Sequence, residues 1–185
     1  MTIRVLLADD QALLAGTFRI LIDADDDMEV VGVAGDGIQA VRLARATTPD
    51  VVVMDIGMPG KDGLTAAEEI THDETLTDTR ILVLTTFETD EHVTRALRAG
   101  VSGFLGKGVD PAEFLGAIRT VAAGDMILSS SATHAVVTRY LAGPAFATTT
   151  PSALGTLTPE NARSWPWPPE ASPTTRSPNA CTSAR

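Results

Sequence analysis

The sequence predicts an α/β protein built on a doubly wound parallel sheet with helices on both faces. Short apolar runs alternate with amphipathic stretches from residue 3 to about residue 124. The apolar runs have the length of strands, and the amphipathic stretches repeat apolar residues at the three- and four-residue spacing of a helix with one buried face. Strict alternation of strand and helix implies parallel strands joined by right-handed crossovers.

Five buried strands are expected, and each is followed by a helix. The apolar runs are IRVLLA, EVVGVA, VVVMD, ILVLTT and GFLGK, at residues 3–8, 29–34, 51–55, 81–86 and 103–107. The helical stretches follow in order at residues 12–24, 37–46, 63–71, 90–99 and 111–123. Asp110 before Pro111 supplies an N-cap and a proline at the first helical position, which marks the start of the last of these helices.

Composition excludes several classes of protein. The 185 residues contain one cysteine, Cys181, so neither a disulfide framework nor a thiolate metal site is expected. The first residues, MTIRVLLADD, lack the apolar region of a signal peptide, and no apolar run is long enough to span a membrane, so we expect a cytoplasmic protein. A formal net charge of -10 opposes tight contact with DNA phosphates.

Three carboxylates follow strands that should end at the same edge of the sheet. Asp9 and Asp10 close the first strand, and Asp55 closes the third. In a doubly wound sheet, ligands bind where strands reach their carboxyl ends. Carboxylates that lie so close need a cation, and Mg²⁺ with its oxygen ligands fits best. Asp9 or Asp10 could instead cap the first helix, but capping leaves Asp55 unexplained.

Two further polar residues end neighbouring strands at this edge. Thr85 offers a hydroxyl after the fourth strand, and Lys107 offers an ammonium after the fifth. Alone, Thr85 is an ordinary strand residue and Lys107 an ordinary solvated lysine. Phosphoryl transfer needs a carboxylate nucleophile, a metal that bridges it to phosphate oxygens, and donors for the remaining oxygens. Asp55, Mg²⁺, Thr85 and Lys107 would fill these roles.

Five motifs in order, among them LLADDQ, VVVMDIGMPGKDG, ILVLTTF and ALRAGVSGFLGK, resemble the receiver domain of two-component response regulators. The similarity is greatest to the NarL/FixJ, or LuxR-type, branch and covers about residues 3–124. It implies a flavodoxin-like fold with strand order 2-1-3-4-5. It also implies a sensor histidine kinase as partner, phosphorylation-dependent homodimerisation and a role in transcription regulation.

The resemblance also implies a role for each site residue. Asp55 matches the phosphoacceptor, Asp10 the direct metal ligand, and Asp9 a ligand that acts largely through water. The backbone carbonyl of Gly57 would complete the metal shell. Thr85 and Lys107 match the hydroxyl and the lysine of the reaction site. Phe104 matches the aromatic switch residue, although an ordinary core aromatic fits this position equally well.

The sequence departs from the family pattern at two glycines. Gly57 stands where this branch often has a larger polar residue, which predicts a more flexible loop but leaves a carbonyl ligand possible. Gly108 follows Lys107 where many receivers have Asp or Pro. If the bond between these two residues is cis, as it often is in the family, it is a costly non-proline cis peptide.

The chain after residue 124 changes in character. Residues 126–140 could form a strand end and a short helix, and residues 125–156 are expected to be a linker that is partly helical at its start. In the family, an output domain then opens with a motif like LTPREREVL. Here the sequence reaches Leu157, Thr158 and Pro159 and continues with ENARSWPWPPEAS, whose WPWPP run cannot lie inside a helix.

The genetic code suggests a frameshift as the origin of this tail. Permissible codons for residues 160–184, with one nucleotide restored after the codon of Pro159, allow the reading REREVLALAARGLTNDEIAQRLHIS, which strongly resembles the first helices of a LuxR-type output domain. Residues 157–185 are therefore interpreted as the remnant of a helix-turn-helix domain that is out of frame and disordered. An ordinary disordered tail predicts no such hidden reading. In either case we expect this chain not to bind DNA.

Three functions compete. The leading hypothesis is a phosphorylation-controlled switch that is not an enzyme acting on outside substrates. An Asp-nucleophile phosphatase also places carboxylates at strand ends, but it needs a second acid two residues after the nucleophile, where this chain has Gly57. A flavodoxin-type cofactor site would need a phosphate-binding loop after the first strand, where Asp9 and Asp10 would repel a phosphate.

Overall fold

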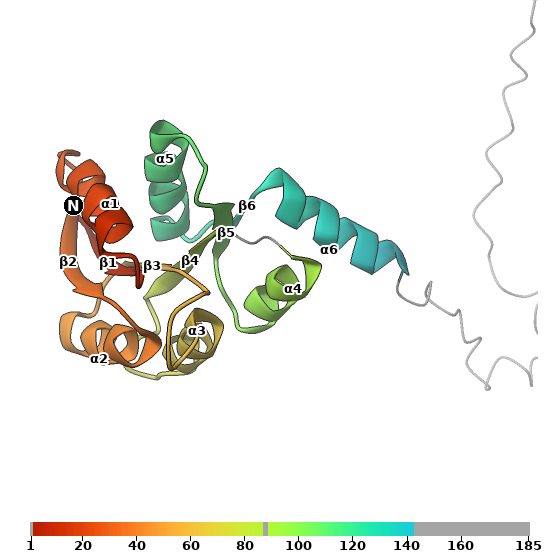
Figure 1. The fold of residues 1–185 in the computed structure, drawn as a ribbon, viewed down its shortest axis with the longest axis horizontal. Coiled ribbons are helices and arrows are strands. Elements are labelled where there is room, and N and C mark those ends of the chain that lie inside the picture. The colour runs from red at the N-terminus through yellow and green to blue at the C-terminus, as the bar shows by residue number, and fades with distance from the viewer. Residues whose placement is uncertain (1, 87–88, 143–185) are drawn as a thin grey trace, which may run out of the picture. The chain divides into compact units, whose positions relative to one another are not determined.

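The computed structural model describes residues 2–86 and 89–142, which form a six-stranded parallel sheet covered by helices on both faces (Figure 1). The strands are β1 (Ile3–Ala8), β2 (Met28–Ala34), β3 (Val51–Met54), β4 (Arg80–Thr85), β5 (Gly103–Gly106) and β6 (Ile127–Leu128). The helices are α1 (Ala12–Asp23), α2 (Gly37–Thr47), α3 (Gly63–Thr71), α4 (Asp90–Arg98), α5 (Pro111–Ala122) and α6 (Ser130–Ala142). All five predicted strands and all five predicted helices are present.

The sheet has the order β2-β1-β3-β4-β5-β6. The expected order 2-1-3-4-5 is confirmed, but the expected number of five strands is wrong, because β6 pairs in parallel with the outer edge of β5. Ile127 lies beside Gly103 and Leu128 beside Phe104. The added strand satisfies backbone groups that the edge of β5 would otherwise expose.

Two apolar clusters, one on each face of the sheet, form the core. One face is covered by α1 and α5, which contribute Phe18, Ile22, Phe114 and Ile118 among others. The rings of Phe18 and Phe114 lie 4.8 Å apart. The other face is covered by α2, α3, α4 and α6, and Figure 1 shows the two helix layers. The four central strands β1, β3, β4 and β5 are mostly buried, as their near-continuous apolar runs predict, whereas β2 and β6 at the edges are partly exposed.

Helix α6 belongs to this packed body. Ala132 and Ala135 are buried in the same apolar cluster as Ala96 of α4 and Phe104 of β5. At its far end, the guanidinium of Arg139 lies 3.4 Å from the hydroxyl of Thr94 on α4. The compact unit accordingly includes all the described residues, 2–86 and 89–142. The predictions for residues 143–185 lie outside the described residues.

Helix starts at the carboxyl edge of the sheet are capped by side chains that the sequence supplies. Asp110 is the N-cap of α5, with Pro111 after it, as predicted. Asp36 caps α2, Asp62 caps α3 and Thr89 caps α4, each by accepting a backbone N–H bond. Helix α1 differs, because its N-cap is Gln11, whose side chain makes no capping bond.

Candidate phosphoryl-transfer site

The three aspartates converge at the carboxyl edge of the sheet. Ala8 and Met54 are neighbours in the register of β1 and β3, so the residues that follow them meet. The backbone N–H of Asp55 donates to the carbonyl of Ala8 over 2.8 Å. One carboxylate oxygen from each of Asp9, Asp10 and Asp55 lies within 4.8 Å of the others. Three carboxylate oxygens this close together could hold a hard divalent ion such as Mg²⁺.

The triad combines two buried carboxylates with one exposed carboxylate. Asp9 is 7 % exposed and Asp55 is 6 % exposed, whereas Asp10 faces solvent. Asp9 also accepts the backbone N–H of Gln11 over 2.9 Å, so it stabilises the turn that leads into α1. Asp10 makes no hydrogen bond or ion pair with the described residues, and helix capping therefore does not explain its position.

Lys107 lies between the two buried carboxylates. Its ammonium is 2.7 Å from Oδ2 of Asp9 and 2.9 Å from Oδ2 of Asp55, and its side chain is only 4 % exposed. Burial opposes the charged form of this lysine, but the hydrogen bonds to Asp9 and Asp55 outweigh burial and raise the pKa of Lys107 above its usual value. Three carboxylates against one ammonium leave a formal charge of −2, which favours a divalent cation.

Thr85 and Gly57 border the same site. Thr85 ends β4 and is 3 % exposed, and its carbonyl accepts the backbone N–H of Lys107 over 2.8 Å. Gly57 is exposed, and a Cβ placed there would lie 3.9 Å from Oδ2 of Asp55. Apart from this oxygen, a Cβ on Gly57 would meet no other heavy atom within 4 Å beyond its chain neighbours.

Phe104 is a core residue. Its ring is fully buried in the cluster that α4 and α6 cover, and its carbonyl accepts the backbone N–H of Ser129 over 2.9 Å. The switch role implied by the resemblance stays a prediction. The peptide bond between Lys107 and Gly108 is not cis, because the described residues contain no cis peptide.

Sequence reasoning missed two contacts of the site. The expected partner of Lys107 was the phosphoryl group, and its ion pair with Asp9 was not foreseen. The close approach of Gly63 to the backbone of Asp55 was also missed. The signal in the sequence was the glycine at the first position of a helix that begins eight residues after the nucleophile.

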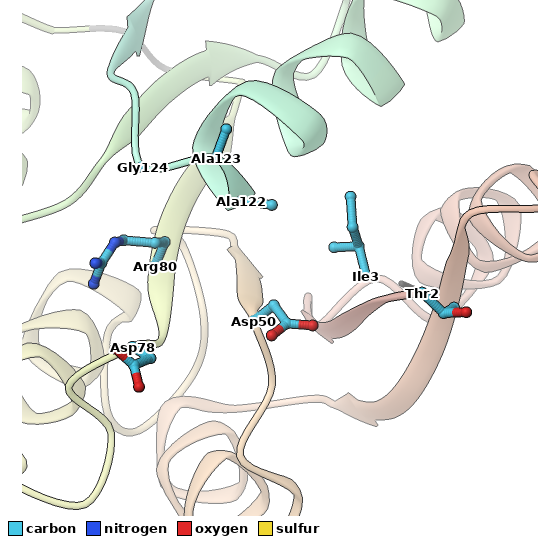
Figure 2. Close-up of a pocket in the computed structure, with 8 residues that line it drawn as sticks. All are labelled: Thr2, Ile3, Asp50, Asp78, Arg80, Ala122, Ala123 and Gly124. Atoms are coloured by element: carbon cyan, nitrogen blue, oxygen red, sulfur yellow. The ribbon is translucent and has the colours of Figure 1, made fainter.

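A separate hollow of about 320 Å³ lies at the opposite edge of the sheet (Figure 2). It is lined by the start of β1, the start of β4 and the end of α5, together with Asp50 and Asp78. Two of its charged groups have structural partners: Asp50 accepts the backbone N–H of Arg4 over 2.7 Å, and Arg80 donates to the carbonyl of Thr77 over 2.9 Å. This hollow takes no part in the carboxylate site.

None of the helices among residues 2–86 and 89–142 combines the length and the apolar character needed to cross a membrane.

Comparison with known proteins agrees with the geometry. Residues 5–119 match the response regulator receiver domain. The uncharacterized transcriptional regulatory protein YxjL of Bacillus subtilis is 47 % identical over 125 residues, which is 68 % of this chain and 56 % of YxjL. The transcriptional regulatory protein DesR of the same organism is 43 % identical over 125 residues, 68 % of this chain and 61 % of DesR. The chain thus matches less than two thirds of the length of these relatives.

Solved structures show the same fold. A LuxR-family two-component response regulator from Aurantimonas sp. SI85-9A1 superposes with a TM-score of 0.70 at 34 % identity, covering 76 % of this chain and 99 % of that one. The receiver domain of the response regulator NarL from Mycobacterium tuberculosis superposes with a TM-score of 0.64 at 32 % identity, covering 66 % and 98 %.

Proposed function

Because the chain belongs to the family of response regulator receiver domains, with relatives of the NarL/LuxR type, we propose that it accepts a phosphoryl group on Asp55. The family is one of two-component signalling proteins and not of classical enzymes, and it implies a cognate histidine kinase. The observation that carries the proposal is the position of Asp55, which is buried, bonded to the Lys107 ammonium and close to the carboxylates of Asp9 and Asp10.

We assign Asp10, Asp9 and Asp55, with the carbonyl of Gly57, as the residues that hold Mg²⁺. The cation supplies the positive charge that allows an anionic phosphoryl group to approach an anionic carboxylate. The oxygen donors and the formal charge of −2 fit a hard divalent ion.

The residues then divide the work of phosphoryl transfer. An oxygen of Asp55 attacks phosphorus, the bond from phosphorus to the donor's leaving atom breaks, and the leaving group departs with the bonding electrons. Lys107 already donates to Asp55 and can donate to a phosphoryl oxygen with little movement. Thr85, at the end of the adjacent strand, supplies a hydroxyl for another oxygen.

The conformational change caused by phosphorylation would be transmitted by the elements that follow Thr85 in the chain. An inward shift of Thr85 would change the packing of Phe104 and α4, and both lie against α6. Helix α6 connects the receiver to residues 143–185, so a change in its docking is a direct way to transmit the signal to that segment.

We also propose phosphorylation-dependent pairing of two receivers and, for the intact chain, a cytoplasmic location.

We further propose that this chain has lost DNA binding, although its relatives are named as transcriptional regulators. Support comes from the sequence after Pro159, which contains the WPWPP run and no lysine. A helix-turn-helix needs a recognition helix in the major groove and cationic contacts to phosphates. Footprinting on a promoter of an intact relative tests this, and protection by the phosphorylated 185-residue chain would refute it.

Intact mass measurement with acetyl phosphate tests the phosphoacceptor. The chain should gain one phosphoryl group with Mg²⁺ and none when the divalent cation is chelated. Asp55→Asn should abolish the gain, while Asp50→Asn, a substitution at the opposite edge of the sheet, should leave it unchanged. Labelling of Asp55→Asn at the rate of the unmodified protein would show that the phosphoacceptor is another residue.

A further inference from the structure

The first residue of α3 rests directly on the backbone of the phosphoacceptor. A Cβ built on Gly63 would lie 1.8 Å from the carbonyl oxygen of Asp55, 2.8 Å from its carbonyl carbon and 3.1 Å from Cα of Ile56. The backbone N–H of Gly63 also donates to the carbonyl of Ile56 over 3.0 Å. Helix α3 therefore touches the peptide group that joins Asp55 to Ile56, and no side chain longer than hydrogen fits between them.

Both partners of this contact, the Asp55 backbone and helix α3, are fixed in place by other contacts. Asp55 follows β3, which lies in the sheet between β1 and β4, and its N–H is bonded to Ala8. Helix α3 is fixed by fully buried residues on its inner face, including Ala66 and Ile70, and by its N-cap Asp62. Since neither the strand nor the helix can retreat, the turn that starts at Asp55 would have to absorb any added volume.

We propose that Gly63 is a positioning residue for phosphoryl transfer: it allows α3 to fix the backbone of Asp55 so that its carboxylate meets Asp9, Asp10 and Lys107. This inference rests on the proposed function of Asp55. The clash with alanine requires a shift of more than 1 Å, the difference between 1.8 Å and the shortest ordinary Cβ contact of 3.0 Å. A misplacement of roughly 1 Å costs a reaction on the order of 100-fold in rate.

A second glycine provides a matched control. A Cβ on Gly37, the first residue of α2, would lie 2.5 Å from the carbonyl oxygen of Lys61, at the far end of the loop that follows Asp55. Gly37→Ala therefore strains the same loop at a helix start, and its Cβ also lies 3.1 Å from the Cβ of Ala66 on α3, but it does not touch the peptide of Asp55. If steric strain anywhere in this loop were enough to slow phosphorylation, the two alanine variants would lose phosphorylation rate equally.

The experiment compares Gly63→Ala with Gly37→Ala in the full chain. The measurements are the initial rate of phosphorylation by acetyl phosphate, the Mg²⁺ affinity by calorimetry, and the folded fraction by circular dichroism. For Gly63→Ala we expect a rate lower on the order of 100-fold and weaker Mg²⁺ binding while the protein is folded. For Gly37→Ala we expect less than about a tenfold change, because the shift acts away from Asp55.

Equal rates and affinities for Gly63→Ala and the unmodified protein would overturn the inference, and so would equal losses in the two variants. If the unmodified protein is not phosphorylated at all, it is the proposed function that fails. In that case Mg²⁺ affinity still reports separately on whether Gly63 positions Asp55.

A milder pair of variants decides the question if Gly63→Ala does not fold. Asp62 caps α3 by accepting the backbone N–H of Thr65 over 2.9 Å, and Asp36 caps α2 by accepting that of Gln39 over 2.8 Å. Asp62→Ala loosens the turn that contacts Asp55, whereas Asp36→Ala loosens the turn that contacts Lys61. A greater loss of Mg²⁺ affinity in Asp62→Ala supports the inference, and equal losses reject it.

Discussion

Removal of the Lys107 ammonium should destabilise the receiver because it leaves two buried carboxylates without their cation. In Lys107→Met the apolar stem is kept and the charge is lost. The ammonium lies 2.7 Å from Asp9 and 2.9 Å from Asp55, and the three side chains are 4 %, 8 % and 7 % exposed. Removal of one partner from a buried ion pair costs about 3–5 kcal/mol. We expect a loss of about 3 kcal/mol, the lower end, because exposed Asp10 gives water and cations access to the site.

Urea unfolding at neutral pH, with and without saturating Mg²⁺, measures this loss. The site of Lys107→Met has a formal charge of −3 in place of −2, so Mg²⁺ should bind the variant more tightly and stabilise it more than it stabilises the unmodified protein. The double variant Lys107→Met, Asp55→Asn has one unpaired buried carboxylate fewer, so it should regain about 1–2 kcal/mol of the free energy of unfolding. Unfolding of Lys107→Met within about 0.5 kcal/mol of the unmodified protein would refute this role of the ammonium, and so would equal stabilisation of both proteins by Mg²⁺.

Three further predictions concern the metal, the edge of the domain and its acid stability. Asp10→Ala should weaken Mg²⁺ binding in calorimetry much more than Thr85→Ala does, because only the aspartate offers a charged ligand, and equal losses would mean that the roles are misassigned. Ala135→Asp puts a carboxylate into a site that is 5 % exposed, so amide exchange in α6 should rise at least tenfold while that of β1 to β4 is kept. Hydrogen bonding to Arg119 lowers the pKa of Asp27 to about 2 from 3.8, so the stability that this pair contributes is present above pH 4 and is lost as the pH falls towards 2. A carboxyl NMR titration should show this midpoint, and Arg119→Ala should raise the pKa of Asp27 towards its ordinary value of 3.8; an unchanged midpoint would contradict the pairing.

The site was predictable from the sequence because parallel strands bring their carboxyl ends to one edge. Asp9, Asp10 and Asp55 directly follow apolar runs that could only be buried strands, and their meeting follows from the sheet. Asp110 and Pro111 marked a helix start for a similarly local reason, the geometry of the first helical turn. Such features depend on a few consecutive residues and on a topology that leaves little choice.

The strand end expected within residues 126–140 is confirmed by β6, but its place in the sheet was not predictable. Ile127 and Leu128 are too few to show a strand pattern, and they pair because β5 leaves an unsatisfied edge. The approach of Ile127 also depends on Gly103, where a Cβ would lie 3.0 Å from the Ile127 side chain. Similarly, the weakly amphipathic α6 is ordered by packing against α4, a partner that precedes it by some forty residues.

By itself, the sequence determined the α/β class, the order of elements along the chain and the edge at which the aspartates gather. Local periodicity and the rules of parallel sheets specify these properties without knowledge of distances. Only the tertiary structure decided that Lys107 bonds Asp9 as well as Asp55, that α3 touches the Asp55 backbone at Gly63, and that α6 covers α4. These contacts join residues far apart in the chain over distances of a few ångströms, and such closeness depends on how all the elements pack together.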